Sequence, residues 1–129
     1  MSEVVREFFD RDMLFKNPKD IVDVIIREHR KLHDVPFEQR EERVKKVTKR
    51  IKNEICICRH PIVKKMIDWG EAKGKSEYAR DFERVIRDLL SKGIKSAEDI
   101  KKVGEAVERF RRGLMEYVEN RILRGRRGS

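Results

Sequence analysis

The sequence has few cysteines and no long apolar run. Cys56 and Cys58 are its only cysteines, and two cysteines one residue apart do not make a disulfide framework. No apolar run of about 18 residues is present, so no transmembrane span is expected. Glu3 and Glu7 interrupt the N-terminal segment, which therefore does not resemble a signal peptide. These absences indicate a protein that is intracellular or assembled inside a cell.

Aromatic residues and catalytic motifs are also scarce. Aromatic side chains make up 7% of the chain, and few lie among the basic residues, so single-strand binding by base stacking is unsupported. The sequence has no Gly-rich phosphate loop, Ser-His-Asp order or HExxH motif. Asp68, Glu71 and Glu77 lie close together in sequence, but ordinary surface ion pairs explain them equally well. We therefore expect no enzyme and no cofactor.

Charged residues are abundant, and positive charge is in surplus. They make up 44% of the chain, with 33 Lys and Arg against 24 Asp and Glu, for a net charge of +9. Heat adaptation explains abundant charges of both signs but not a surplus of one. Such a surplus attracts a polyanion, namely a nucleic acid, an anionic membrane surface or an acidic protein. With 38% hydrophobic residues, the composition suits helices with narrow apolar stripes that need partners.

Apolar residues recur at helical spacing along most of the chain, which predicts an all-α helical bundle with long amphipathic helices and extended terminal arms. Asn17-Pro18 is a typical helix start, and that helix should end near Asp34. No segment alternates between apolar and polar residues for long enough to predict a strand. Residues 54–58 are the only candidate, and they lie inside a helical pattern. The predicted divisions are an N-terminal helical arm (1–16), a helical DNA-binding and assembly domain (17–123) and a flexible basic tail (124–129). The arm could be ordered only against a neighbouring molecule.

Two predicted helices carry narrow apolar seams. The third helix should open at Pro36 and run to about Ile57, with a heptad seam formed by Phe37, Val44, Ile51 and Cys58. A short helix should follow Pro61. A long helix capped at Ser96 carries apolar residues from Ile100 to Ile122. We expect both seams to be buried against other subunits.

The third helix also carries the strongest candidate binding site. Six of the ten residues from 43 to 52 are basic and none is acidic. Like charges at this density destabilise an isolated helix, so an opposing polyanion is the natural compensation. A solvated face balanced by acids of other helices is the alternative. The predicted phosphate contacts are Arg43, Lys45, Lys46, Lys49, Arg50 and Lys52.

A second basic set lies near the C-terminus. Arginine matches the geometry of phosphate, and a glycine-spaced arginine tail can follow a sugar-phosphate backbone without a fixed fold. A disordered solubilising end is the alternative. The predicted contacts in this set are Arg111, Arg112, Arg121, Arg124, Arg126 and Arg127.

Cysteine and histidine residues raise the question of a metal site. Cys56, Cys58 and His60 would need His29 and His33 beside them to complete a zinc site. This spacing is not that of a zinc finger or ribbon. Two buried cysteines and a histidine at a helix boundary are the more ordinary interpretation, so no metal is predicted.

The small, basic and helical chain with arm-like ends and the basic helix at 43–52 resembles the nucleocapsid (major coat) proteins of filamentous archaeal viruses from hyperthermophilic hosts, of the tristromavirus kind. Residues 57–61, the segment through Gly70, and Tyr78-Ala79-Arg80 are similar to the helical part of CRISPR-associated RecB-like nucleases, whose catalytic strands and full cysteine set have no counterpart here. The resemblance implies subunits paired with themselves or with a related second coat protein. It also implies that they wrap linear double-stranded DNA, often in A-form, within a virion.

The sequence therefore predicts a structural nucleocapsid protein that binds double-stranded DNA through sequence-independent phosphate contacts and assembles into a helical filament. A helical transcription regulator or chromatin-like protein is one alternative, and it would give a discrete footprint. An accessory remnant of a RecB-like nuclease is a second alternative. An adaptor that binds other proteins, with charges serving only heat adaptation, is a third.

Overall fold

The computed structural model describes the backbone of residues 2–124 and the side chains of residues 2–122. It is an all-α helical bundle, 81% helical, with one two-stranded sheet, which confirms the predicted fold class. The elements in chain order are α1 (Glu3–Asp12), β1 (Met13–Phe15), α2 (Pro18–Lys31), a 3-10 turn (Leu32–Asp34), α3 (Phe37–Asn53), β2 (Cys56–Cys58), α4 (Pro61–Met66), α5 (Trp69–Gly74), α6 (Glu77–Lys92), α7 (Ala97–Glu119) and a π-turn (Asn120–Arg124).

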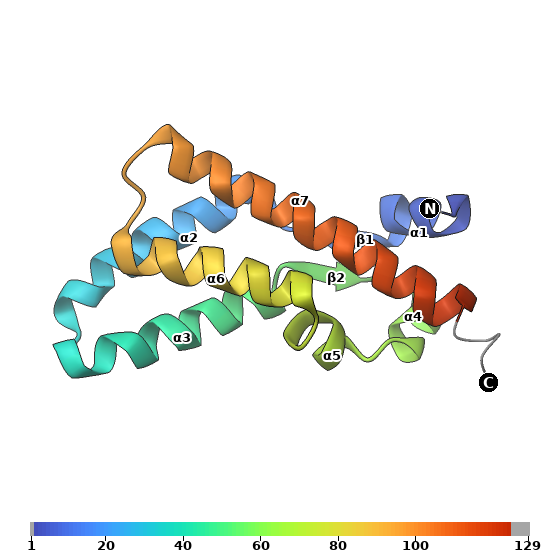
Figure 1. Cartoon of the computed structure of the whole chain (residues 1–129), viewed down its shortest axis with the longest axis horizontal. Helices are drawn as coiled ribbons and strands as arrows, with labels where there is room; N and C mark the ends of the chain where they lie inside the picture. Colours follow the sequence, from blue (N-terminus) through green and yellow to red (C-terminus); the bar gives the residue numbers. More distant parts are fainter. Residues whose placement is uncertain (1, 125–129) are drawn as a thin grey trace.

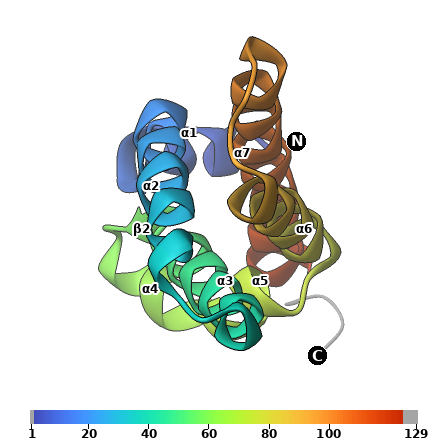
Figure 2. The ribbon, with the colours of Figure 1, turned by 90° about the vertical axis from the view of Figure 1, so that its left-hand side faces the viewer.

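Helix α6 is the centre of the bundle, and it packs against α7, α3 and α2 (Figure 1). Seen from one end, α2 and α3 lie on one side of the molecule and α6 and α7 on the other (Figure 2). The core between them is aromatic and aliphatic. Phe110 of α7 is fully buried and meets the rings of Tyr78 and Phe82 edge-on, at 5.2 and 5.5 Å between ring centroids. This geometry is one that aromatic pairs prefer.

Polar side chains start several helices where the sequence predicted them. The side chain of Asn17 accepts a hydrogen bond from the amide of Lys19, and that of Ser96 accepts one from Asp99. Ser76 precedes α6 but forms no capping hydrogen bond with its side chain. Helix α6 ends at Gly93, whose φ of 84° lies in the region that glycine adopts without strain.

The predicted subunit seams are for the most part buried within the single chain. Val44, Val47 and Ile51 of α3 are at most 7% exposed, and Val103, Phe110, Leu114 and Val118 of α7 are fully buried. The expectation that these seams need another subunit was therefore wrong, because α6 covers both. Two residues of the predicted seams remain outside the core, because Phe37 is 80% exposed and Ile100 is 49% exposed.

A short β-ribbon replaces the predicted end of the third helix. Helix α3 ends at Asn53, and β2 pairs antiparallel with β1 in the register Met13 with Cys58 and Phe15 with Cys56. The ribbon places Cys56 and Cys58 on the core face and leaves Ile57 61% exposed. The prediction of one continuous helix to about Ile57 was wrong. The prediction that the chain contains no strand was also wrong. The predicted short helix after Pro61 is divided into α4 and α5.

Helix α1 is packed on the same core as the rest of the chain. Val5 and Phe9 are buried, and α1 lies against α7. The backbone amide of Ser2 donates a hydrogen bond to the Glu119 carboxylate at 3.1 Å, and Arg111 of α7 forms an ion pair with Asp10. The N-terminal segment is thus ordered against its own chain in this structure.

Two glycines of α7 differ sharply in their surroundings and provide a matched test of packing. A Cβ at Gly104 would have no neighbour within 4 Å, whereas one at Gly113 would clash with the ring of Tyr78. We expect Gly104→Ala to stabilise the fold by about 0.5–1 kcal/mol, because alanine restricts the unfolded chain and favours helix. We expect Gly113→Ala to destabilise it by about 1–3 kcal/mol, the usual cost of overpacking. Urea denaturation of both variants checks the pair, and equal shifts would contradict the packing of Tyr78 on α7.

Candidate nucleic-acid interface

A buried carboxylate lies between α2 and α3 and is surrounded by cations. Glu28 is 3% exposed. Its two carboxylate oxygens each accept a hydrogen bond of 3.1 Å from a terminal guanidinium nitrogen, one from Arg43 and one from Arg50. The ammonium of Lys31 lies 3.7 Å from the same carboxylate. One negative charge thus fixes the positions of three positive charges.

The protonation of Glu28 is governed by burial and by these partners. Burial raises the pKa of the carboxyl group, but hydrogen bonds from Arg43 and Arg50 and the charge of Lys31 outweigh it, so the pKa lies below its ordinary value of 4.5. The carboxylate therefore stays ionised at neutral pH. It holds the guanidinium groups in fixed places, as charge-assisted hydrogen bonds do.

Further cations extend this arrangement along both helices. Arg27 on α2 and Lys46 and Lys49 on α3 are exposed, and none of them forms an ion pair within residues 2–122. A groove of about 360 Å³ between the helices is lined by Arg27, Lys31 and Arg50 among others. We call the following seven residues the Glu28 cluster: Arg27, Glu28, Lys31, Arg43, Lys46, Lys49 and Arg50. Six cations and one anion give it a net charge of +5 at neutral pH.

The structure separates the six predicted residues of the third helix into four groups. Arg43 and Arg50 face α2, and Lys46 and Lys49 face solvent. The ammonium of Lys45 lies 3.9 Å from the carboxylates of Glu41 and Glu42, at the margin of an ion pair. Lys52 is buried at 7% exposure and forms a 2.8 Å ion pair with Glu83 of α6. Lys52 is therefore part of the bundle and lies away from the exposed face.

The C-terminal set is not gathered at the same place. Arg111 pairs with Asp10 of α1 at 3.3 Å, and Arg121 pairs with Glu71 of α5 at 3.0 Å while its guanidinium lies over the ring of Tyr117. Arg112 is exposed. The side chain of Arg124, and Arg126 and Arg127 altogether, lie outside the described residues. The described members of this set thus belong to α7 and its neighbours, apart from the Glu28 cluster.

Sequence reasoning did not identify Glu28, Arg27 and Lys31 as site residues. The sequence did carry a signal, because Glu28 continues the buried positions Ile21 and Ile25 of α2 and Leu32 of the next turn at spacings of three and four residues. An acid on the apolar face of a helix is costly unless a cation meets it. The basic run of the next long helix, α3, could supply that cation.

The cysteine and histidine residues do not come together. The Nδ1–H of His29 donates a hydrogen bond to the Leu90 carbonyl oxygen, and the ring lies against Gly93, whereas Cys56 and Cys58 lie in the ribbon. Among residues 2–122, no group of three or more metal-ligating side chains is placed to hold an ion. Burial raises the pKa of the Cys56 thiol to about 11, which disfavours the thiolate that binds metals.

Asp68, Glu71 and Glu77, the carboxylates that lie close together in sequence, each have a local structural role. Asp68 caps α5 by accepting a hydrogen bond from the Glu71 amide, and Glu71 forms the ion pair with Arg121. Glu77 lies in the first turn of α6, where the helix dipole favours an acid. These three residues therefore have local reasons to be acidic.

No described helix combines the length and apolar character that crossing a bilayer requires. Comparisons with models of protein families, with curated proteins and with solved structures gave no match to the chain.

Proposed function

We propose that the chain is a structural protein that binds the phosphate backbone of double-stranded DNA and packages it in a filament. The observation that supports this proposal is the Glu28 cluster, in which a buried carboxylate orients two arginines beside four further cations. Arg43 and Arg50 each use one terminal nitrogen on Glu28, and their side chains remain 40% and 46% exposed. Their remaining N–H groups are thus accessible to phosphate oxygens, which guanidinium groups bind well.

The mechanism is electrostatic and indifferent to base sequence. Each phosphate neutralised by a cation releases condensed counterions, so affinity falls steeply as salt rises. The residues of the Glu28 cluster are arginines and lysines around one acid, with no exposed aromatic ring or amide among them to read base edges. The packaging role and the filament come from the resemblance to coat proteins of archaeal viruses, and they extend the backbone-binding proposal to a virion.

A salt titration with short duplexes tests the proposal. We expect the logarithm of the affinity to fall linearly with the logarithm of salt, with a slope of about −4 to −5 if five or so phosphates are contacted. Two duplexes of unrelated sequence should give equal affinities. A slope near zero would overturn the proposal, and a strong preference for one sequence would favour the transcription regulator. Electron microscopy with linear DNA then distinguishes filaments from isolated complexes.

A further inference from the structure

A second cationic groove lies beside the β-ribbon, and its wall includes Trp69, the only tryptophan of the chain. We call it the Trp69 groove. It measures about 620 Å³, a volume within the range of small-molecule sites, about 300–1,000 Å³. Lys16, Lys64 and Lys73 line the groove against one acid, Glu54. The groove therefore carries a surplus of positive charge beside an aromatic ring.

Trp69 and Lys73 are held in place on the wall of this groove. The indole Nε1–H of Trp69 donates a hydrogen bond of 2.9 Å to the backbone carbonyl oxygen of Lys64. The ammonium of Lys73 lies 5.8 Å from the centroid of the indole ring. It donates hydrogen bonds to the backbone carbonyl oxygens of Asn53 and Cys56, at 3.1 and 2.8 Å. A ring and a cation fixed before a ligand arrives lower the entropic cost of binding.

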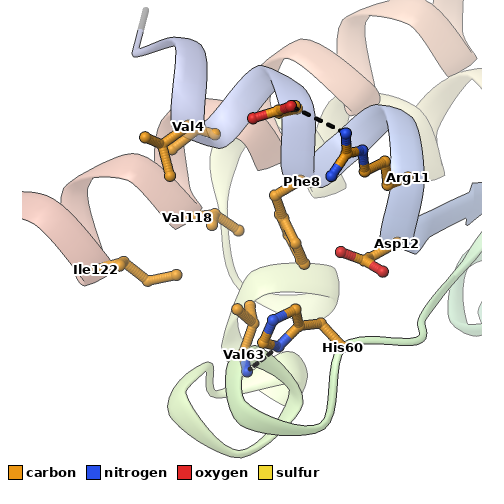
Figure 3. Close-up of a pocket in the computed structure, with 10 residues that line it drawn as sticks. Val4, Phe8, Arg11, Asp12, His60, Val63, Val118 and Ile122 are labelled. Carbon is orange, nitrogen blue, oxygen red and sulfur yellow. Dashed lines mark hydrogen bonds and ion pairs between the residues drawn. The ribbon is translucent and has the colours of Figure 1, made fainter.

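Helix α4 presents neighbouring residues to different surfaces. Its start is fixed by His60, whose Nδ1 accepts a hydrogen bond of 3.3 Å from the Val63 amide (Figure 3). Val63 lines an apolar hollow against α1 and α7, whereas Lys64 lines the Trp69 groove. Lys65 is also exposed, but it lines neither of them. The two adjacent lysines thus have the same charge and helix but a different position relative to the groove.

The Trp69 groove adjoins the groove of the Glu28 cluster. Lys16 and Glu54 line both grooves and form an ion pair of 3.5 Å with each other. The second groove is also lined by Arg27, Lys31 and Arg50. A strand whose phosphates bind at the Glu28 cluster can therefore continue past Lys16 toward Trp69.

We propose that the Trp69 groove binds an unpaired nucleotide at the end of a duplex, with its base against the indole ring and its phosphates beside Lys16 and Lys64. The base must be unpaired, because a base within a duplex has both faces covered by its neighbours. Stacking on an aromatic ring suits every base, so the groove requires no particular sequence. The inference rests on the proposed function for the duplex that continues at the Glu28 cluster. The sequence did not indicate the site, because Trp69 and the lysines come from separate elements.

Two DNAs with the same number of phosphates test the groove. One is a blunt duplex, and the other is a shorter duplex with a single-stranded end of about five nucleotides, within the range that single-strand sites cover. At equal salt, the full chain should bind the second DNA about tenfold to a hundredfold more tightly, the effect expected for stacking of one base. Because Trp69 is the only tryptophan, the second DNA should quench its fluorescence and the blunt duplex should not.

Lys64→Glu and Lys65→Glu are the matched variants, with the same change of charge on one helix. Lys64→Glu should lower the preference for the single-stranded end by about eightfold or more, the value of one phosphate contact at about 0.1 M salt, and Lys65→Glu should keep it. Trp69→Leu should abolish the preference, while Trp69→Phe retains an aromatic face and should keep most of it. Circular dichroism checks the fold of each variant, and the lysine variants decide the outcome if Trp69→Leu does not fold.

Equal affinity of the parent chain for the two DNAs, with unchanged Trp69 fluorescence, would overturn the proposal, as would equal effects of Lys64→Glu and Lys65→Glu. A blue shift of the fluorescence with vesicles of anionic phospholipid, without quenching by DNA, would assign the groove to a membrane surface instead. Salt-dependent binding of the blunt duplex without any preference disproves the groove alone. Binding that requires the single-stranded end, with none to the blunt duplex, disproves the proposed function alone.

Discussion

Reversing two lysine charges on α3 should weaken duplex binding by about a hundredfold. At about 0.1 M salt, each phosphate contact is worth about a factor of eight in affinity through counterion release, so losing two costs about sixtyfold, and repulsion by new acids adds to this. The double variant is Lys46→Glu with Lys49→Glu. Both side chains are exposed and form no ion pair within residues 2–122, so the fold should tolerate the change.

The control must carry the same change in net charge at another place. Lys95→Glu with Lys101→Glu meets this requirement, because both lysines are exposed and lie near the start of α7. We expect the control to bind duplex within about threefold of the parent and to keep its salt slope, while the α3 variant loses about two units of slope. Equal losses in the two variants would mean that net charge matters and the Glu28 cluster does not.

Replacing Glu28 should produce a large loss of stability. Glu28→Gln leaves three cations without their buried carboxylate, and breaking a buried charged network typically costs about 2–4 kcal/mol. Glu41→Gln is the control. Its side chain is 77% exposed and lies 3.9 Å from Lys45, so its loss should cost less than about 0.5 kcal/mol. Denaturant unfolding at neutral pH compares the two variants.

The effect of Glu28 should also depend on pH in a defined direction. Because its folded pKa lies below 4.5, the carboxylate contributes its full stability above that value. The contribution falls as pH decreases through the depressed folded pKa. The parent and Glu28→Gln should therefore differ most at neutral pH and approach one another in acid. A stability difference that grows in acid would contradict the ion cluster.

The helices were predictable because their signals are local. Asn17-Pro18 at the start of α2, Ser96 before α7 and Gly93 after α6 each act through their own backbone and immediate neighbours. The ribbon was not predictable in this way. Its strands are three residues long, and β2 acquires its partner from β1 far earlier in the chain. Cys58 also continued the heptad of α3, so its periodicity pointed to the wrong element.

The candidate site was predictable in part, for a related reason. The basic run of α3 is visible in the sequence, but the partner of each cation depends on which helix packs beside it. Lys52 turns toward Glu83 of α6, and Arg50 turns toward Glu28 of α2. Positions two residues apart on a helix point in very different directions. Composition therefore predicted a surplus of charge, while helix packing decided which charges are exposed.

The β-ribbon has a consequence for the order in which this chain folds. Pairing of β1 with β2 closes a loop made of residues 16–55, which contains all of α2 and α3. Closing so long a loop is entropically costly unless the intervening helices have already shortened it. We therefore expect the α2–α3 hairpin to form early in folding and the ribbon to form after it. Until the ribbon forms, the folding chain has its cationic helices but lacks the anchored α1 that packs against α7.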